Sequence, residues 1–234
     1  MHVHRFGLLA LSGAALLGAL IIPAWSDNLP TIPSPKGFIE SSNLVPALKD
    51  QALLGHPKRT RVIGVYLLPD ELASIMHGAP QHMTIFCRAY VNDEFGSPDE
   101  AKAFFRQLVV GAKKEQSNKF DLTDPDVGRI VQRYVDATKE RQGQSVNMIG
   151  ATFLGSILET EDIYAMSVIV STSAQTDQGQ VLIPLTGAVA WIRRGNQILE
   201  LSDIAQFKES KSIETANGVI LEWVEALPST NIAK

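Results

Sequence analysis

The chain has 234 residues, of which 45% are hydrophobic and 20% charged, and its formal net charge is −4 at pH 7. This composition is that of a folded globular protein and excludes a disordered chain. The mildly acidic balance also argues against binding to nucleic acid or attraction to an anionic membrane surface.

The first 26 residues have the pattern of an export signal. A short basic start at Arg5 precedes an apolar run from Phe6 to Ala24, and small residues lie three and one positions before Asp27. Signal peptidase recognises this order of basic, apolar and small residues. We therefore expect residues 1–26 to be removed and the protein to be periplasmic. The alternative is a membrane-anchored domain, because the apolar run is just long enough to cross a bilayer.

Residues 27–36 contain three prolines and no periodic apolar pattern. We expect them to form an extended tether between the membrane side and a single folded domain at residues 37–231. The spacing of apolar and β-branched residues then predicts, in chain order, a short helix at 42–54, a strand at 61–68, a helix at 69–76 and a strand at 83–91.

The chain's one cysteine, Cys87, lies within the second of these strands. An exported protein with a single thiol has no internal disulfide, so its core alone must stabilise it. We interpret Cys87 as a small apolar residue of the strand. A catalytic thiolate and an intermolecular bridge are the alternatives.

Ser97 marks the clearest helix start in the chain. Its hydroxyl can cap the helix, Pro98 suits the first helical position, and Glu100 can reach back to complete a capping box. Apolar residues then recur at helical spacing as far as Ala112. A second amphipathic helix is predicted at residues 124–143.

The pattern becomes strand-like after this helix. Four runs of β-favourable residues, separated by short polar turns, lie at 145–158, 163–173, 180–193 and 197–204. Gly195-Asn196 tolerates the positive φ of a tight hairpin turn. A final amphipathic helix is predicted at 212–227. Four strands without intervening helices indicate an antiparallel meander, and the amphipathic helices around it indicate an α+β fold with the sheet packed between helices.

The last part of the chain, residues 188–231, carries a family resemblance. A strand containing Trp191 and Arg193 turns at Gly195 and returns, and a helix containing Trp223 follows. This order resembles the closing hairpin and helix of the PsbP-like and DcrB-like envelope protein family. The resemblance implies an α/β/α sandwich and a role in binding or assembly. It implies no shared reaction, and no catalytic residue carries over.

Two clusters of potential metal ligands lack the pattern that a metal site requires. His77 and His82 lie five apart on a predicted loop without a clear third partner, whereas a zinc site needs three or four ligands. The acids Asp121, Asp124 and Asp126 lack the glycine and the spacing of a calcium loop, and helix capping explains them. We expect no metal and no cofactor.

The sequence contains no nucleophile elbow, dinucleotide-binding glycine pattern or phosphate-binding loop. This favours binding or assembly over catalysis, and we assign no catalytic residue. The alternative function is a periplasmic hydrolase or transferase whose active-site residues are dispersed along the chain.

Four residues are the candidates for contact with a partner or ligand. Trp191 and Trp223 are expected to pack together between the sheet and the last helix, or to line a pocket there for a small apolar ligand. Arg193 and Arg194 at the hairpin tip could hold an anionic partner or keep a sheet edge soluble. The sequence thus predicts an exported, non-catalytic binding or assembly protein whose partner is an envelope protein or a small apolar ligand. It sets no oligomeric state.

Overall fold

The computed structural model describes residues 29–53, 60–78, 85–92, 95–116, 146–176 and 179–228. The strands in these ranges are β1 (Ile39–Glu40), β2 (Thr60–Leu67), β3 (Ile85–Asn92), β4 (Val146–Glu159), β5 (Ile163–Thr176), β6 (Gly179–Arg194) and β7 (Gln197–Gln206). The helices are α1 (Ala47–Leu53), α2 (Pro69–Met76), α3 (Pro98–Gln116) and α5 (Ser210–Ala226). The predicted α+β class is confirmed.

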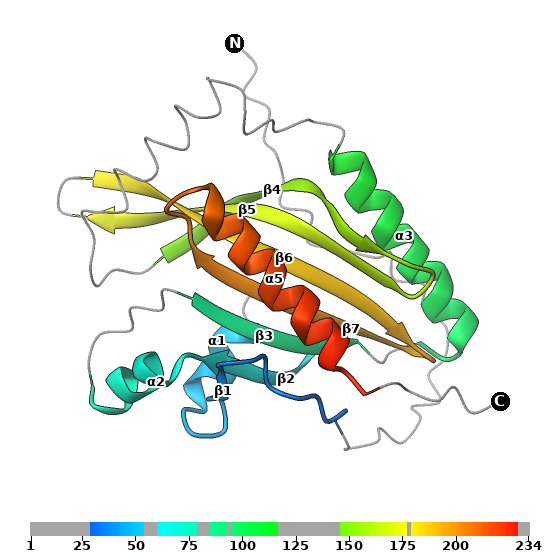
Figure 1. Ribbon diagram of the computed structural model, residues 1–234, viewed down its shortest axis with the longest axis horizontal. Helices are drawn as coiled ribbons and strands as arrows, with labels where there is room; N and C mark the ends of the chain where they lie inside the picture. Colours follow the sequence, from blue (N-terminus) through cyan, green and yellow to red (C-terminus); the bar gives the residue numbers. More distant parts are fainter. Residues whose placement is uncertain are drawn as a thin grey trace, which may run out of the picture.

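All seven strands form one antiparallel sheet in the order β1-β2-β3-β7-β6-β5-β4 (Figure 1). The predicted meander of four strands is confirmed as the consecutive neighbours β4 to β7. Gly195, with φ of +59°, makes the tight turn between β6 and β7. Sequence patterns did not show that β3 pairs with β7, which joins the two halves of the chain into one sheet.

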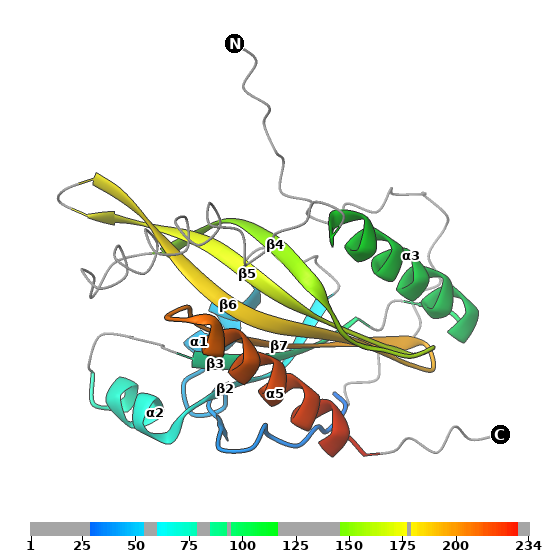
Figure 2. The same ribbon diagram turned by 45° about the horizontal axis from the view of Figure 1, so that its top comes forward.

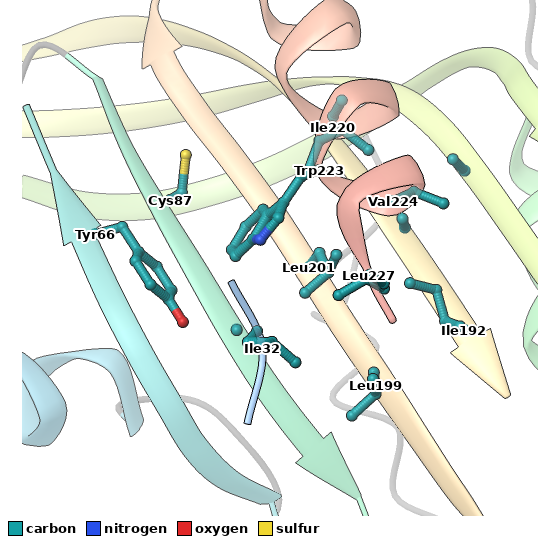
Figure 3. Close-up of a cluster of buried hydrophobic side chains, with 14 of the residues drawn as sticks. Ile32, Tyr66, Cys87, Ile192, Leu199, Leu201, Ile220, Trp223, Val224 and Leu227 are labelled. Carbon is teal, nitrogen blue, oxygen red and sulfur yellow. The ribbon is translucent and has the colours of Figure 1, made fainter. Parts of the chain in front are cut away.

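Helix α5 covers one face of the sheet, and α3 lies on the opposite side (Figure 2). Alanines on three strands line much of the face under α5, and leucines of β7 lie between them: Ala89 on β3, Ala165 on β5, Ala188 and Ala190 on β6, and Leu199 and Leu201 on β7. Because alanine extends so little from the sheet, large side chains of the helix can fill the space above it. Figure 3 shows Trp223 pointing from α5 onto this face, between Tyr66 and Leu201.

The opposite face carries larger side chains. Phe105, Leu108 and Ala112 of α3 pack on Tyr164, Met166, Val168 and Ile198 of the sheet. A separate cluster forms where Leu48 and Ala52 of α1 pack on β2 and β3. Along β5, for example, the α3 side carries Tyr164 and Met166, whereas the α5 side carries Ala165 between them.

The predicted start of α3 is confirmed, with one difference. Ser97 Oγ accepts a hydrogen bond from the Glu100 backbone N–H at 3.3 Å, as a capping residue does. The Glu100 carboxylate reaches one residue further back than expected and accepts from the Gly96 N–H at 2.9 Å. The helix therefore begins where the sequence indicates, with one of its terminal N–H groups capped by Ser97 and the preceding turn held by Glu100.

Residues 29–36, which we call the N-terminal strap, form no helix or strand and belong to the core. Ile32 is 8% exposed and lies in the cluster under α5, and Leu29 packs against that cluster. The Trp223 indole Nε1 donates a hydrogen bond to the Pro33 carbonyl oxygen at 2.7 Å. The strap is thereby fixed to both the sheet and α5.

Several predictions fall on residues outside the described ranges: the export signal at 1–26, the helix at 124–143, His82 and the acids Asp121, Asp124 and Asp126. They stay predictions. Within the described ranges, no helix is both long enough and apolar enough to span a bilayer.

Candidate functional site

The four residues predicted to contact a partner lie on two different faces of the sheet. Trp191 packs with the α3 cluster, whereas Trp223 belongs to the α5 cluster. The expectation that the two tryptophans share one layer is therefore wrong. Successive residues of a strand point to opposite faces, and Ile192, the neighbour of Trp191, lies under α5. Trp191 must then lie on the other side.

The two arginines are separated in the same way, and both are engaged within the domain. Arg193 forms an ion pair with Asp162 in the β4–β5 turn. Arg194 donates from Nη2 to the Pro228 carbonyl oxygen at 3.1 Å, just after α5. The structure does not bring the arginines together as a grip for an anionic partner.

Trp223 is a core residue. It is 1% exposed, and its ring meets Tyr66 edge-on at 5.1 Å between centroids and an angle of 80°. A hollow of about 290 Å³ lies outside this layer, between the strap and α5, and is lined by Lys36, Thr215, Gly218, Val219 and Glu222. Neither predicted tryptophan lines that hollow.

Trp191 is half-buried and held in a fixed position. Its Nε1 donates a hydrogen bond to Glu200 Oε2 at 3.2 Å, and its ring stacks on Tyr164 at 6.2 Å between centroids. These contacts follow from register, because Trp191 is paired with Glu200 on β7 and with Tyr164 on β5. One ring face and the N–H group are thus occupied within the domain.

Arg88 lies on β3, the strand next to β7, which carries Glu200. Its guanidinium is 5.2 Å from the Phe86 ring centroid and 5.6 Å from the Tyr90 centroid. Cation–π contacts of this kind orient a guanidinium. Arg88 pairs in register with Ser202, and its Nε and the Ser202 Oγ are buried without a hydrogen-bond partner among the described residues.

The half-buried side chains of this region form the candidate binding surface, which we call the Trp191 face: Phe86, Arg88, Val189, Trp191 and Glu200. It spans β3, β7 and β6, the central strands of the sheet. Trp191 was among the predicted contact residues. Arg88 and Glu200 were not, although their alternation with buried apolar residues along β3 and β7 was visible in the sequence.

The face under α5 buries an ionisable pair, Cys87 and Asp203. Both residues are 0% exposed, and Cys87 Sγ donates to Asp203 Oδ1 at 3.4 Å. Among the described residues, Oδ2 has no hydrogen-bond partner. Burial therefore raises the pKa of Asp203 to about 7, although the thiol hydrogen bond opposes the shift. Asp203 alternates with Leu199 and Leu201, a signal of burial that sequence reasoning missed.

Burial also raises the pKa of the Cys87 thiol far above its usual range, and the neighbouring Asp203 adds to the effect. The thiolate is the reactive form of cysteine. The prediction that Cys87 is a buried residue of a strand is confirmed, and its full burial contradicts both a catalytic thiolate and an intermolecular bridge.

His77 is exposed at the end of α2, with Nδ1 2.7 Å from the Ala73 carbonyl oxygen. No three potential metal ligands lie together in the part of the chain that the structure describes.

No protein-family model matches the chain, and no curated protein matches it. Among solved structures, the extracellular domain of PknH from Mycobacterium tuberculosis aligns with 70% of this chain at 11% sequence identity and a TM-score of 0.25. The alignment spans 66% of that chain, just under two thirds of it. Because a TM-score this low does not establish a shared fold, the interpretation depends on the geometry of the site.

Proposed function

We propose that this chain is an exported envelope protein that binds another envelope protein and catalyses no reaction. The Trp191 face is the observation that carries the proposal. Tryptophan and arginine are the residue types that most often dominate binding energy at protein interfaces. Here Trp191 is held by Glu200 and Tyr164, and Arg88 by Phe86 and Tyr90. Such fixed side chains lose little conformational entropy when a partner binds.

The proposal includes membership of the PsbP-like and DcrB-like group of envelope proteins. Its support is the hairpin of β6 and β7, the turn at Gly195, and the following helix α5 with Trp223. An antiparallel sheet with helices on both sides agrees with the α/β/α sandwich of that group. Binding and assembly are the roles that the resemblance implies.

The proposal also places the domain in the periplasm after removal of residues 1–26. Its support is the basic, apolar and small-residue order of the N-terminus. N-terminal sequencing of the exported protein tests this part, and we expect Asp27 at the new terminus. An intact Met1 in the membrane fraction would instead establish the anchored form.

Partner binding is tested by cross-linking in living cells, with affinity purification and mass spectrometry of the tagged chain. We expect Trp191→Ala to reduce recovery of the partner at least about tenfold, as for an interface hot spot. Val110→Ala is the matched control, because Val110 is an apolar residue on α3 that is 66% exposed. It should leave recovery unchanged.

Trp191→Phe separates binding from folding, because it keeps an aromatic ring stacked on Tyr164 but removes the indole N–H. Thermal unfolding of each variant shows whether the domain is intact. Equal recovery with wild type and a folded Trp191→Ala variant would overturn the proposed surface. Failure to recover any specific partner with wild type would overturn the proposed function.

A further inference from the structure

The hairpin of β5 and β6 extends past the end of the neighbouring strand β7. Residues 179–184 of β6 pair with residues 171–176 of β5, whereas β7 ends with Gln206 opposite Leu185. No described strand pairs with residues 179–184 on the side of β7. Figure 1 shows the two yellow strands projecting beyond β7 at this end of the sheet. We call this side of residues 179–184, which is open except where Phe207 bonds Pro184, the β6 arm edge.

Pro184 explains why β7 stops there. Its carbonyl oxygen accepts a hydrogen bond from the Phe207 N–H at 3.2 Å, so the backbone polar group of Pro184 faces the β7 side. Proline has no N–H to donate to a further β7 residue. The chain then leaves the sheet and enters α5 at Ser210.

The direction of the Pro184 carbonyl also fixes which backbone groups the arm offers. In an antiparallel strand, the N–H and C=O of alternate residues point to the same side. The register of β5 and β6 runs without a shift from Ile163 to Thr176, so this alternation continues along the arm. The N–H and C=O groups of Gln180 and Leu182 therefore face the open side.

The two outer edges of the sheet are interrupted or covered in ways not found at this edge among the described strands and loops. Strand β4 has register shifts at Met148/Gly150, Phe153/Gly155 and Ser156/Leu158, and such bulges break a regular row of donors and acceptors. On β2, strand β1 pairs with Tyr66 and Leu67, and the loop after β1 bonds the backbone of Val65.

The β6 arm edge is regular, and its sequence Gln-Val-Leu-Ile at 180–183 carries no charge. Charged residues, bulges and coverage are the usual means by which a protein prevents strand addition. Among the described residues this edge has none of these protections, and such an edge fits an incoming strand, which gains its affinity from main-chain hydrogen bonds.

We propose that the β6 arm edge binds an extended, uncharged peptide segment of a partner protein, which adds to the sheet beside β6 in line with β7. Gln180 and Leu182 each donate one N–H and accept at one C=O. A segment of about five residues is long enough to reach both. This surface is separate from the Trp191 face, and the proposal stands whether or not that face binds a partner.

The test is an NMR titration of the isotope-labelled, exported chain with a blocked hexapeptide of alternating threonine and valine. We expect the amide signals of Gln180 and Leu182 to shift and their hydrogen exchange to slow at least about tenfold. The same peptide with N-methyl groups on the pairing edge is the matched probe, and it should cause neither change, because it cannot donate the required hydrogen bonds.

Leu182→Pro is the matched variant, because it removes one of the two N–H groups that face the open edge, and proline is tolerated where a strand's N–H faces solvent. We expect it to weaken peptide binding at least tenfold, while Leu182→Val, which keeps the N–H, binds as wild type does. The amide spectrum outside the arm shows that both variants are folded. Trp191→Ala should bind the peptide normally, which distinguishes failure of this proposal from failure of the proposed function.

Three results would overturn the proposal: equal binding of the N-methylated peptide, shifts that lie away from residues 179–184, or unchanged binding by folded Leu182→Pro. A doubled mass in light scattering, with the Gln180 and Leu182 amides already protected before peptide is added, would also overturn it. That result would assign the edge to a second copy of this chain.

Discussion

The two faces of the sheet differ in side-chain size and in how completely they are covered. Under α5, alanines on β3, β6 and β5 lie below a helix whose Trp223 is 1% exposed. On the opposite face, Arg88, Val189, Trp191 and Glu200 are only half-buried. Because the alanine side chains are small, α5 can approach the sheet closely. Water is excluded even from the carboxyl group of Asp203, which is 0% exposed. The α5 face is therefore the more completely buried of the two among the described residues.

The largest expected effect is the difference in lost unfolding free energy between Trp223→Ala and Trp191→Ala. Trp223→Ala removes the contact with Tyr66 and the hydrogen bond to the strap, and truncation of a buried tryptophan costs about 3–5 kcal/mol of unfolding free energy. Trp191→Ala should cost about 2 kcal/mol or less, because the ring is half-buried. Urea unfolding of both variants measures the contrast. Equal losses would show that the two faces contribute equally to stability.

Asp203→Asn should remove a pH dependence of folding stability that arises under α5. The folded pKa of about 7 lies above the usual value near 4, so the folded state holds the proton more tightly. Stability from this group is fully present below about pH 4 and is lost as the pH rises through about 7, at up to ~1.4 kcal/mol per pH unit.

Urea unfolding of wild type and Asp203→Asn from pH 4 to 8 tests this sign. The asparagine variant keeps an acceptor for the Cys87 thiol but cannot ionise, so its stability should fall less over this range. Wild-type stability that rises with pH, relative to the variant, would contradict the buried neutral carboxyl.

Gly187→Ala tests how closely the central strands approach. A Cβ at Gly187 would lie 2.3 Å from the Asp203 carbonyl oxygen. Strands β6 and β7 would have to move apart to relieve this clash. We expect a loss of about 1–3 kcal/mol of unfolding free energy. Gly155→Ala on β4 is the control, because its Cβ would meet no atom within 4 Å. Equal stability of the two variants would show that the strands adjust without cost.

Lys102→Gln should have the smallest effect. Lys102 pairs with Glu161 at 2.5 Å and lowers the pKa of that carboxyl, but Glu161 is exposed. Exposed ion pairs contribute little to stability and are screened by salt. We expect no measurable change in melting temperature at 150 mM salt, because Phe105 and Leu108 hold α3 on the sheet. A clear loss would show that charge, and not apolar packing, positions this helix.

The sequence predicted each described helix and the long strands, because their apolar periodicity and caps are local. It did not show that β3 pairs with β7, since strand pairing depends on the whole sheet. Nor did it place Trp191 and Trp223 correctly, because the face that a helix will cover is a tertiary property. The alternation of Ala188, Ala190 and Ile192 with Trp191 contained the necessary signal, but its meaning depends on where α5 docks.

The N-terminal strap has a consequence for the order of maturation. Leu29, which packs against the α5 cluster, lies three residues after the predicted cleavage site at Ser26. Three extended residues span at most about 10 Å, so a docked strap and a peptidase would compete for the same short stretch of chain. For a chain processed at this site, proteolysis precedes the docking of Ile32 and Pro33. In such a chain, the layer between the sheet and α5 closes only after the cleavage.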